Sequence, residues 1–187
     1  MPDVIMISGP NGAGKSTLAP SLLRDTLNVV EYVNADTIAQ GLSAFAPEMA
    51  AIQAGRIMLR RLDELAERNA DFAFETTLAT LSYARRIKSL QSAGYRFQLI
   101  YLWLNSPELA VERVKERVRL GGHHIPEDTV RRRFERGRKN FINIYMPLAD
   151  AWKVFDTSTS DLDAVAAGDK IVGGYVYNET IWKMIEG

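Results

Sequence analysis

Eight consecutive residues near the N-terminus, Gly9 to Ser16, have the types and spacing needed to bind a chain of phosphates. They read GPNGAGKS and fit the pattern G-x-x-x-x-G-K-S of the phosphate-binding loop, or P-loop. Glycines let such a loop turn tightly and point its N–H groups at an anion. A helix starting at Lys15 would add the positive end of its dipole. We therefore expect the loop to bind ATP, with Lys15 on the β- and γ-phosphates and the Ser16 hydroxyl on Mg²⁺.

The segments beside the loop supply the strand and the helix that the motif requires. The apolar run Val4-Ile5-Met6-Ile7 precedes the loop, and a helical pattern over residues 15–24 follows it. Pro20 lies inside this pattern, where it lacks the N–H that a helix needs, so we expect a bend there. The residues assigned to the nucleotide in this region are Gly9, Pro10, Asn11, Gly12, Ala13, Gly14, Lys15, Ser16 and Thr17.

Further along the chain, apolar strand runs alternate with helical patterns. The other expected strands cover residues 29–33, 71–74, 97–104 and 152–155, and helices are expected over 47–69, from Leu81 to Gly94, after Ser106 and over 178–185. In the helix over 47–69, Met49, Ile52, Leu59, Leu62 and Ala66 recur at helical spacing. Two turn signals within residues 164–177 indicate an edge hairpin. The pattern predicts one α/β domain over residues 1–187, a doubly wound P-loop NTPase with a mainly parallel five-stranded sheet flanked by helices.

Each expected strand is followed at once by polar residues. These residues are Gly9, Asp36, Glu75, Asn105 and Asp156. In open parallel sheets, ligands bind beyond the carboxyl ends of the strands. We therefore expect Lys15, Asp36 and Glu75 to meet in one cleft although they are far apart in the sequence.

Transfer of a phosphoryl group to a hydroxyl needs a carboxylate that accepts the proton of the hydroxyl. Asp36 is the leading candidate for this base, and the alternative is a helix-capping role before Thr37. Glu75 and Thr76 are assigned to the substrate side, and the alternative for Glu75 is an ordinary solvated carboxylate. The apolar run that ends at Leu104 is followed by Asn105 and not by an aspartate that could assist Mg²⁺. Either Asp36 or Glu75 must then hold the water molecules around Mg²⁺. The third alternative is that Ser16 and the phosphates hold the metal for the most part.

A basic segment follows the fourth strand. Residues 112–139 contain ten Lys and Arg residues but only five Asp and Glu residues. The pair Gly121-Gly122 lies at its centre, next to His123 and His124, for which we expect hinge or surface roles. This pattern is typical of a mobile arginine-rich cover, here residues 117–140, that brings arginines onto phosphates.

The arginines of this cover fall into two groups. Arg117 and Arg133 are assigned to catalysis, and Arg136 to nucleotide binding. For Arg113, Arg138 and Lys139 we favour the alternative, a solvated helix with Glu–Arg pairs.

The composition of the whole chain limits the partners. Lys plus Arg equals Asp plus Glu at 23 each, so no overall field attracts nucleic acid or a membrane surface. The absence of cysteine excludes disulfides and thiolate chemistry. No apolar run approaches the length of about 20 residues that spans a membrane. We expect a cytoplasmic protein without nucleic-acid or membrane partners.

Four segments together resemble the zeta toxin family of P-loop kinases. They are GPNGAGKST, VNADTIAQGL, FETT and RVRLGGHHIPEDTVRRRFERGRKNF, and the similarity covers residues 3–158, closest to the chromosomal branch that contains GGH. The resemblance implies phosphorylation of the amino sugar of UDP-N-acetylglucosamine by ATP. It implies that Asp36 is the base, that Glu75 lies on the substrate or metal side, and that a small helical antitoxin is a partner.

Two functions remain open at this point. The first is a small-molecule kinase, which uses Asp36 as base, Glu75 as metal support and the cover as clamp. The second is a module that binds and hydrolyses ATP and acts as a switch through a partner protein. A switch has no need of a proton acceptor beside the γ-phosphate, so the segment around Asp36 distinguishes the two. A kinase of nucleic-acid ends is a weaker third choice.

Overall fold

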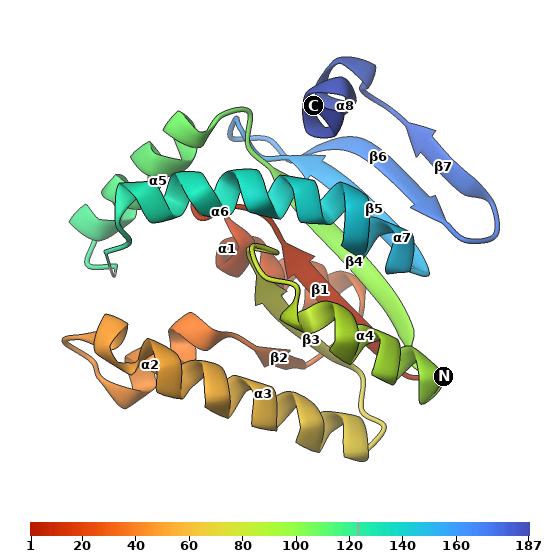
Figure 1. Ribbon diagram of the computed structural model, residues 1–187, viewed down its shortest axis with the longest axis horizontal. Helices are drawn as coiled ribbons and strands as arrows, with labels where there is room; N and C mark the ends of the chain where they lie inside the picture. Colours follow the sequence, from red (N-terminus) through yellow and green to blue (C-terminus); the bar gives the residue numbers. More distant parts are fainter. Residues whose placement is uncertain (123) are drawn as a thin grey trace.

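In the computed structural model, which describes residues 1–122 and 124–187, the strands form one seven-stranded sheet in the order β2-β3-β1-β4-β5-β6-β7 (Figure 1). His123, for which a hinge or surface role was expected, lies outside the described residues. The strands are β1 Asp3–Ser8, β2 Glu31–Val33, β3 Phe72–Thr76, β4 Arg96–Trp103, β5 Ala151–Asp156, β6 Asp163–Asp169 and β7 Gly173–Val176. Strands β1 to β5 run parallel, and β6 and β7 are antiparallel.

The expected count of five strands is correct for the parallel part and wrong for the sheet. The expected C-terminal edge hairpin is confirmed, because β6 pairs with β5 and β7 pairs with β6. Without β6, strand β5 would expose an unpaired row of backbone groups at the edge of the sheet. The hairpin covers this edge and extends the sheet to seven strands.

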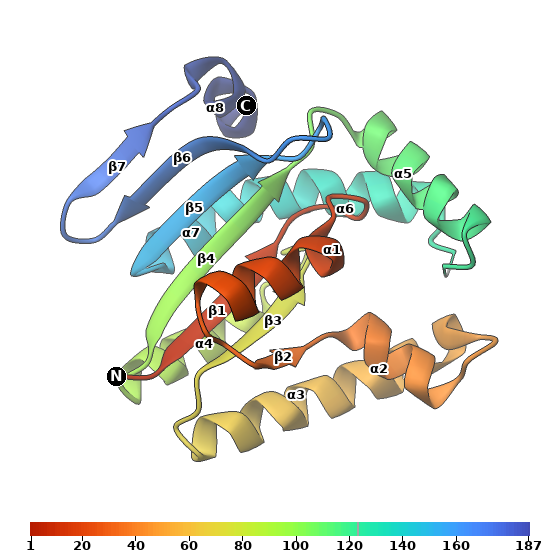
Figure 2. The ribbon, with the colours of Figure 1, turned by 180° about the vertical axis from the view of Figure 1, so that it is seen from behind.

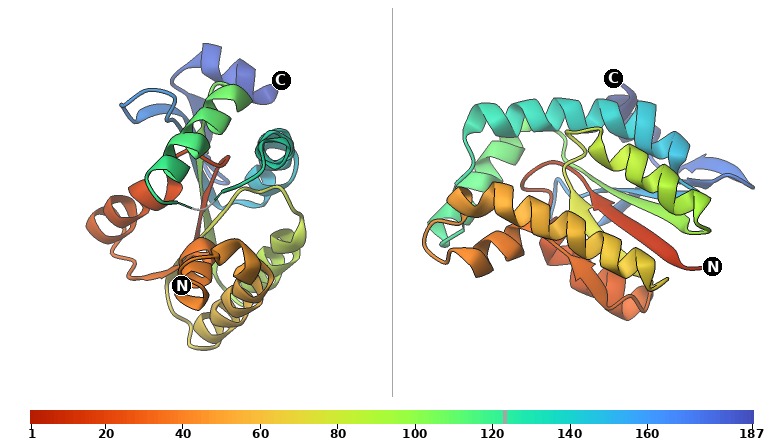
Figure 3. Two further views of the ribbon diagram at one scale, coloured as in Figure 1. Left: turned by 90° about the vertical axis from the view of Figure 1, so that its left-hand side faces the viewer. Right: turned by 60° about the horizontal axis from the view of Figure 1, so that its bottom comes forward.

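Helices cover both faces of the sheet. They are α1 Lys15–Pro20, α2 Ala35–Leu42, α3 Ala51–Glu67, α4 Ser82–Ser92, α5 Pro107–Arg119, α6 Glu127–Asn140, α7 Met146–Leu148 and α8 Glu179–Glu186, with π-helical turns at Ser21–Thr26 and Phe141–Tyr145 and a 3₁₀ turn at Pro47–Ala50. Helices α4 and α6 lie over one face, as Figure 1 shows. Helix α1 lies over the other face (Figures 2 and 3). No helix in this described part of the chain is long and apolar enough to cross a membrane.

Two local expectations for the helices have different outcomes. As expected, the helical segment does not end at Pro20, but its α-helical hydrogen bonds give way there to a π-helical turn that continues to Thr26. The face assigned to the helix over 47–69 is partly wrong, because Met49 and Ile52 are 85% and 76% exposed. The buried side of α3 consists of Ala54, Met58, Leu62 and Leu65. The residues Pro47–Ala50 form a 3₁₀ turn, whose different number of residues per turn shifts Met49 out of line with α3.

Strand β1 positions the site because it lies at the centre of the parallel strands. Its residues Val4 to Ile7 are at most 1% exposed, as expected for a strand covered on both faces. Ile7 pairs with Glu75 of β3, and Ser8 pairs with Tyr101 of β4. The P-loop therefore leaves the sheet between the carboxyl ends of β3 and β4.

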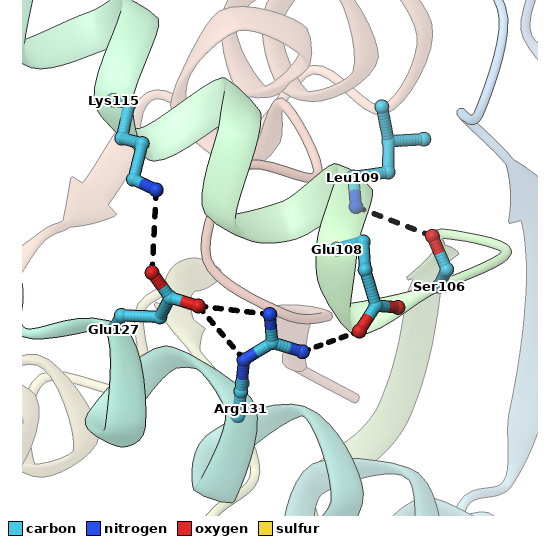
Figure 4. A network of polar contacts seen from close by, with 6 residues as sticks. All are labelled: Ser106, Glu108, Leu109, Lys115, Glu127 and Arg131. Carbon is cyan, nitrogen blue, oxygen red and sulfur yellow. Dashed lines mark hydrogen bonds and ion pairs between the residues drawn. The ribbon is translucent and has the colours of Figure 1, made fainter.

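Helices α5 and α6 form an antiparallel pair that ion pairs hold together (Figure 4). The guanidinium of Arg131 contacts Glu108 and, at 2.8 Å, Glu127, whose other carboxylate oxygen accepts from Lys115 at 3.2 Å. Ser106 caps α5 through the N–H of Leu109 at 3.2 Å, with Pro107 in the first turn as expected. These exposed pairs match the Glu–Arg alternative for part of the segment.

The second half of the expected cover belongs to the core. Val130 and Phe134 of α6 are buried, and Phe134 packs against Trp103 with ring centroids 5.4 Å apart. In the first half of the cover, Arg119, Leu120 and Gly121 are exposed, whereas Ile125 is buried.

Candidate active site

Two glycines of the P-loop have backbone conformations that residues with a side chain disfavour. Gly9 has a φ of 143°, and a Cβ atom there would lie 2.3 Å from the carbonyl oxygen of Leu102. Gly14 has a φ of 79° and immediately precedes α1. Both residues adopt backbone conformations that side chains disfavour, which explains the glycine positions of the motif.

Lys15 lies at the bottom of the loop and is 8% exposed. Its amine donates hydrogen bonds of 2.9 Å to the carbonyl oxygens of Gly9 and Pro10. Burial lowers the pKa of Lys15, and the nearby carboxylates of Glu75 and Asp36 act in the opposite direction. A buried ammonium group favours anionic ligands, since an added negative charge offsets its desolvation.

Residues from the far end of the chain support the loop. The buried hydroxyl of Thr157 is 3.2 Å from the carbonyl oxygen of Ala13 and 2.9 Å from that of Trp103. Arg113 of α5 donates to the carbonyl oxygens of Ser158 at 2.9 Å and Gly12 at 3.4 Å.

The solvated-face interpretation of Arg113 was therefore wrong. Its place beside the buried residues Ala110 and Val114 of α5 could have indicated an inward orientation. Thr157 was missed because only the residue before it, Asp156, was considered at this strand end. Asp156 instead accepts from the N–H of Ser158 at 2.8 Å and forms a local turn.

One cavity of about 440 Å³ opens above the P-loop, a size typical of small-molecule sites. Its lining residues are Asn11, Gly12, Gly14, Lys15, Ser16, Thr17, Asn34, Ala35, Asp36, Met58, Glu75, Thr76, Thr77, Ala79, Thr80, Tyr83, Arg113, Arg117 and Arg133. The structure thus brings Lys15, Asp36 and Glu75 together, as the strand-end argument predicted. We call this cavity above the P-loop the site cavity.

Ser16 and Glu75 contact each other at one side of the site cavity. The Ser16 hydroxyl lies 3.1 and 3.0 Å from the two carboxylate oxygens of Glu75. Of the three arrangements left open for the metal, this contact favours Glu75. The pairing of β3 with β1 places the Glu75 carboxylate beside the P-loop, whereas the segment after β4 offers Asn105 and no carboxylate.

The pair fits Mg²⁺, which prefers hard oxygen ligands, few carboxylates and the oxygens of bound phosphates. Within residues 1–122 and 124–187 no group of three or more His, Cys, Asp or Glu side chains could hold a metal by itself. A metal here would depend on Ser16, on Glu75 directly or through water, and on the nucleotide.

Asp36 is the second residue of α2 and does not cap it. Asn34 fills the capping position, and its Oδ1 accepts from the N–H groups of Asp36 at 2.7 Å and Thr37 at 3.2 Å. The capping alternative for Asp36 is therefore wrong. Burial lowers the pKa of Arg133 in the same cavity, and the negative charge of Asp36 opposes this shift.

The structure separates the arginines of the cover. Arg117 of α5 and Arg133 of α6 line the site cavity, whereas Arg136 is exposed and is not among its lining residues. Successive residues of a helix are rotated by about 100°, so Arg136 lies about 60° further than Arg133 from the buried side of α6. The nucleotide-binding assignment of Arg136 therefore has no support in this arrangement.

Arg138 and Lys139 were both assigned to a solvated face. Lys139 is exposed, as expected. The side chain of Arg138 is only 17% exposed and donates to the carbonyl oxygen of Ile185 in α8 at 2.9 Å. For Arg138 the solvated part of the assignment was wrong, because its guanidinium contacts α8, whereas its ion pair with Glu135 at 3.7 Å agrees with the expected Glu–Arg pairs.

The loop from Thr76 to Thr80 forms another wall of the site cavity, and α6 with its π-helical extension holds it in place. Asn140 donates to the carbonyl oxygen of Leu78 at 2.6 Å, and Tyr145 donates to that of Thr80 at 2.7 Å. A Cβ atom at Gly137 would lie 2.3 Å from the carbonyl oxygen of Thr77, so helix and loop backbones are in direct contact. The backbone of this wall is thus held at Thr77, Leu78 and Thr80.

The fold and the site define the class of the protein. Parallel strands in the order β2-β3-β1-β4-β5, a P-loop after the central strand and helices on both faces are the features of a P-loop NTPase of the kinase type. The family model described as Zeta toxin matches residues 1–160, and the chain belongs to this family.

Three relatives illustrate the similarity. An uncharacterized protein of Haemophilus influenzae is 35% identical over 130 residues, which is 70% of this chain and 91% of that protein. A structure from the PezAT chromosomal toxin–antitoxin system of Streptococcus pneumoniae matches with a TM-score of 0.69 and 16% identity, over 100% of this chain and 79% of that one. The AvrRxo1-ORF1:-ORF2 complex with ATP matches with a TM-score of 0.77 and 17% identity, over 99% of this chain and 63% of that one.

Proposed function

We propose that the chain is an ATP-dependent kinase that transfers the γ-phosphoryl group to a hydroxyl of a small molecule. From the family, the acceptor is a sugar nucleotide similar to UDP-N-acetylglucosamine. The observation that carries the proposal is the position of Asp36. Asn34 takes over the capping of α2, and the carboxylate of Asp36 borders the same cavity as Lys15.

Each residue of the site has a role in this reaction. The P-loop and Lys15 bind the phosphates of ATP. The hydroxyl oxygen of the acceptor attacks the γ-phosphorus, the bond to the bridging β,γ-oxygen breaks, and ADP leaves. Asp36 takes the proton of the acceptor hydroxyl, and Arg117 and Arg133 stabilise the charge on the transferring group. Mg²⁺, held by Ser16 and supported by Glu75, would neutralise charge on the phosphates.

The hydroxyl-bearing wall supports an acceptor rich in polar groups. Thr76, Thr77, Thr80 and Tyr83 border the site cavity and offer donors and acceptors without charge. The positive groups of the site cavity are Lys15 of the P-loop and the arginines Arg113, Arg117 and Arg133. This division suits phosphate groups on the charged side and the sugar part of the acceptor on the other.

A small antitoxin protein is the partner that we propose for the kinase. Two of the similar structures come from two-component assemblies, a toxin–antitoxin system and the AvrRxo1-ORF1:-ORF2 complex. Nucleotide binding is supported in the same way, because the second of these complexes holds ATP.

The test is incubation of the purified protein with γ-labelled ATP, Mg²⁺ and a pool of metabolites that includes sugar nucleotides. A new phosphorylated species, absent when Lys15→Ala replaces the wild type, is the expected result. Release of labelled phosphate alone, with no labelled metabolite, would contradict the kinase and favour the ATP-hydrolysing switch.

A further inference from the structure

Tyr32 has no role in the phosphoryl transfer described above, yet its hydroxyl reaches the metal side of the site. Tyr32 lies in β2, the edge strand, and its hydroxyl donates a hydrogen bond of 2.5 Å to Oε2 of Glu75. The same carboxylate is in contact with Ser16. Tyr32 and Ser16 therefore contact the same carboxylate, that of Glu75.

Asn34 determines the direction of these hydrogen bonds. Its Oδ1 is occupied by the N–H groups at the start of α2, so its Nδ2 must point the other way. Nδ2 lies 3.2 Å from the hydroxyl oxygen of Ser16 and 3.4 Å from that of Tyr32. Both hydroxyls accept from Asn34, so each directs its single proton to Glu75.

The arrangement ties the carboxylate from two sides. A glutamate side chain has three rotatable bonds, and burying it in one conformation costs up to about 2 kcal/mol of conformational entropy. The second donor is the Tyr32 hydroxyl, which comes from β2, on the opposite side of β3 from β1. The two donors together restrict the Glu75 carboxylate to one orientation before any ligand binds.

We propose that Tyr32 is a positioning residue for the metal side of the site, which holds the carboxylate of Glu75 in the orientation that supports Mg²⁺ beside Ser16. The inference rests on the proposed function, because that function supplies the metal. Partners of this kind in metal sites affect metal affinity or activity by about 10- to 100-fold when they are removed.

The test is Tyr32→Phe, which removes one hydroxyl and keeps the ring. Binding of Mn²⁺, as a spectroscopic probe for Mg²⁺, to the protein–ADP complex is measured by electron paramagnetic resonance. We expect the affinity for Mn²⁺ to fall about tenfold or more. In turnover assays the Mg²⁺ concentration for half-maximal rate should rise by a similar factor, with kcat at saturating Mg²⁺ within a few-fold of the wild type.

Two controls separate positioning from a general structural effect. Tyr95→Phe removes a hydroxyl that donates to the carbonyl oxygen of Ala70 at 3.0 Å, away from the site cavity, and should leave the metal affinity unchanged. In a Glu75→Gln background, Tyr32→Phe should have no further effect on the metal affinity, since the two changes act through the same carboxylate.

The outcomes are distinct. Equal Mn²⁺ affinity for the wild type and Tyr32→Phe would overturn the positioning role, whatever happens to the melting temperature. The positioning role would also be overturned if Tyr32→Phe lowered the Mn²⁺ affinity by the same factor in the Glu75→Gln background as in the wild type. The Mn²⁺ measurement needs no acceptor, so failure to find kinase activity would refute the proposed function and leave this result standing.

Discussion

Replacing Asp36 by Asn removes one negative charge from the site cavity and keeps the size of the side chain. The backbone N–H of Asp36 keeps its bond to Asn34, and α2 keeps its cap. The change loses a negative charge in the first turn of α2, which is worth about 0.3 to 1 kcal/mol of stability. The fold should therefore remain intact.

The effect on transfer should be much larger than the effect on stability. A positioned base contributes about 10²- to 10⁴-fold to the rate, which corresponds to about 3 to 5 kcal/mol in the transition state. Asn cannot accept the proton, so we expect the rate of transfer to fall by this factor. The affinity for ATP should stay within a few-fold, because Asp36 is assigned to the acceptor and not to the phosphates.

The matched control is Asp128→Asn. Asp128 occupies the same second position of α6 that Asp36 occupies in α2, but it is exposed and does not line the site cavity. Calorimetric melting and labelled-ATP transfer would be measured for both variants. Both variants should remain folded, and only Asp36→Asn should lose transfer. A rate for Asp36→Asn within a few-fold of the wild type would refute the reasoning, and Glu75 would become the candidate base.

Three further predictions test other parts of the structure. Lys15→Ala should abolish turnover with little change in melting temperature; unchanged ATP affinity in isothermal titration together with unchanged turnover would contradict the P-loop assignment. Gly137→Ala should lower the free energy of unfolding by about 1 to 3 kcal/mol, because its Cβ would meet a backbone carbonyl. Gly55→Ala should raise the free energy of unfolding by about 0.5 to 1 kcal/mol, because the position is open and alanine favours a helix over glycine. Denaturant titration measures both, and equal signs would be inconsistent with the packing. ATP with Mg²⁺ should slow amide exchange in residues 117–122 more than in 130–140, where burial already protects α6; identical exchange with and without nucleotide would return the cover arginines to a solvated role.

The sequence by itself determined the parts that depend on local pattern. The backbone at Gly9 and Gly14 favours glycine, and such motifs therefore keep glycine at fixed spacing. This spacing could be recognised in the sequence without a structure. The parallel strands followed from apolar runs with polar ends, and Ser106 and Pro107 marked the start of α5. The meeting of Asp36 and Glu75 also followed, because parallel strands end at one edge of a sheet.

Only the tertiary structure decided which side chains face the site cavity. A charge pattern shows that a helix is basic, but the elements packed against it decide which side is buried. Arg133 therefore lines the cavity while Arg136 is exposed, and Arg113 supports the P-loop.

The contacts around Glu75 depended on strand order. Tyr32, Asn34 and Ser16 come from an edge strand, a strand end and the loop, and they meet only because β3 lies between β2 and β1. Sequence patterns describe each strand alone and carry no information on its neighbours in the sheet. The base candidate was visible in the sequence, whereas the hydrogen bonds that free Asp36 from capping and orient Glu75 required the fold.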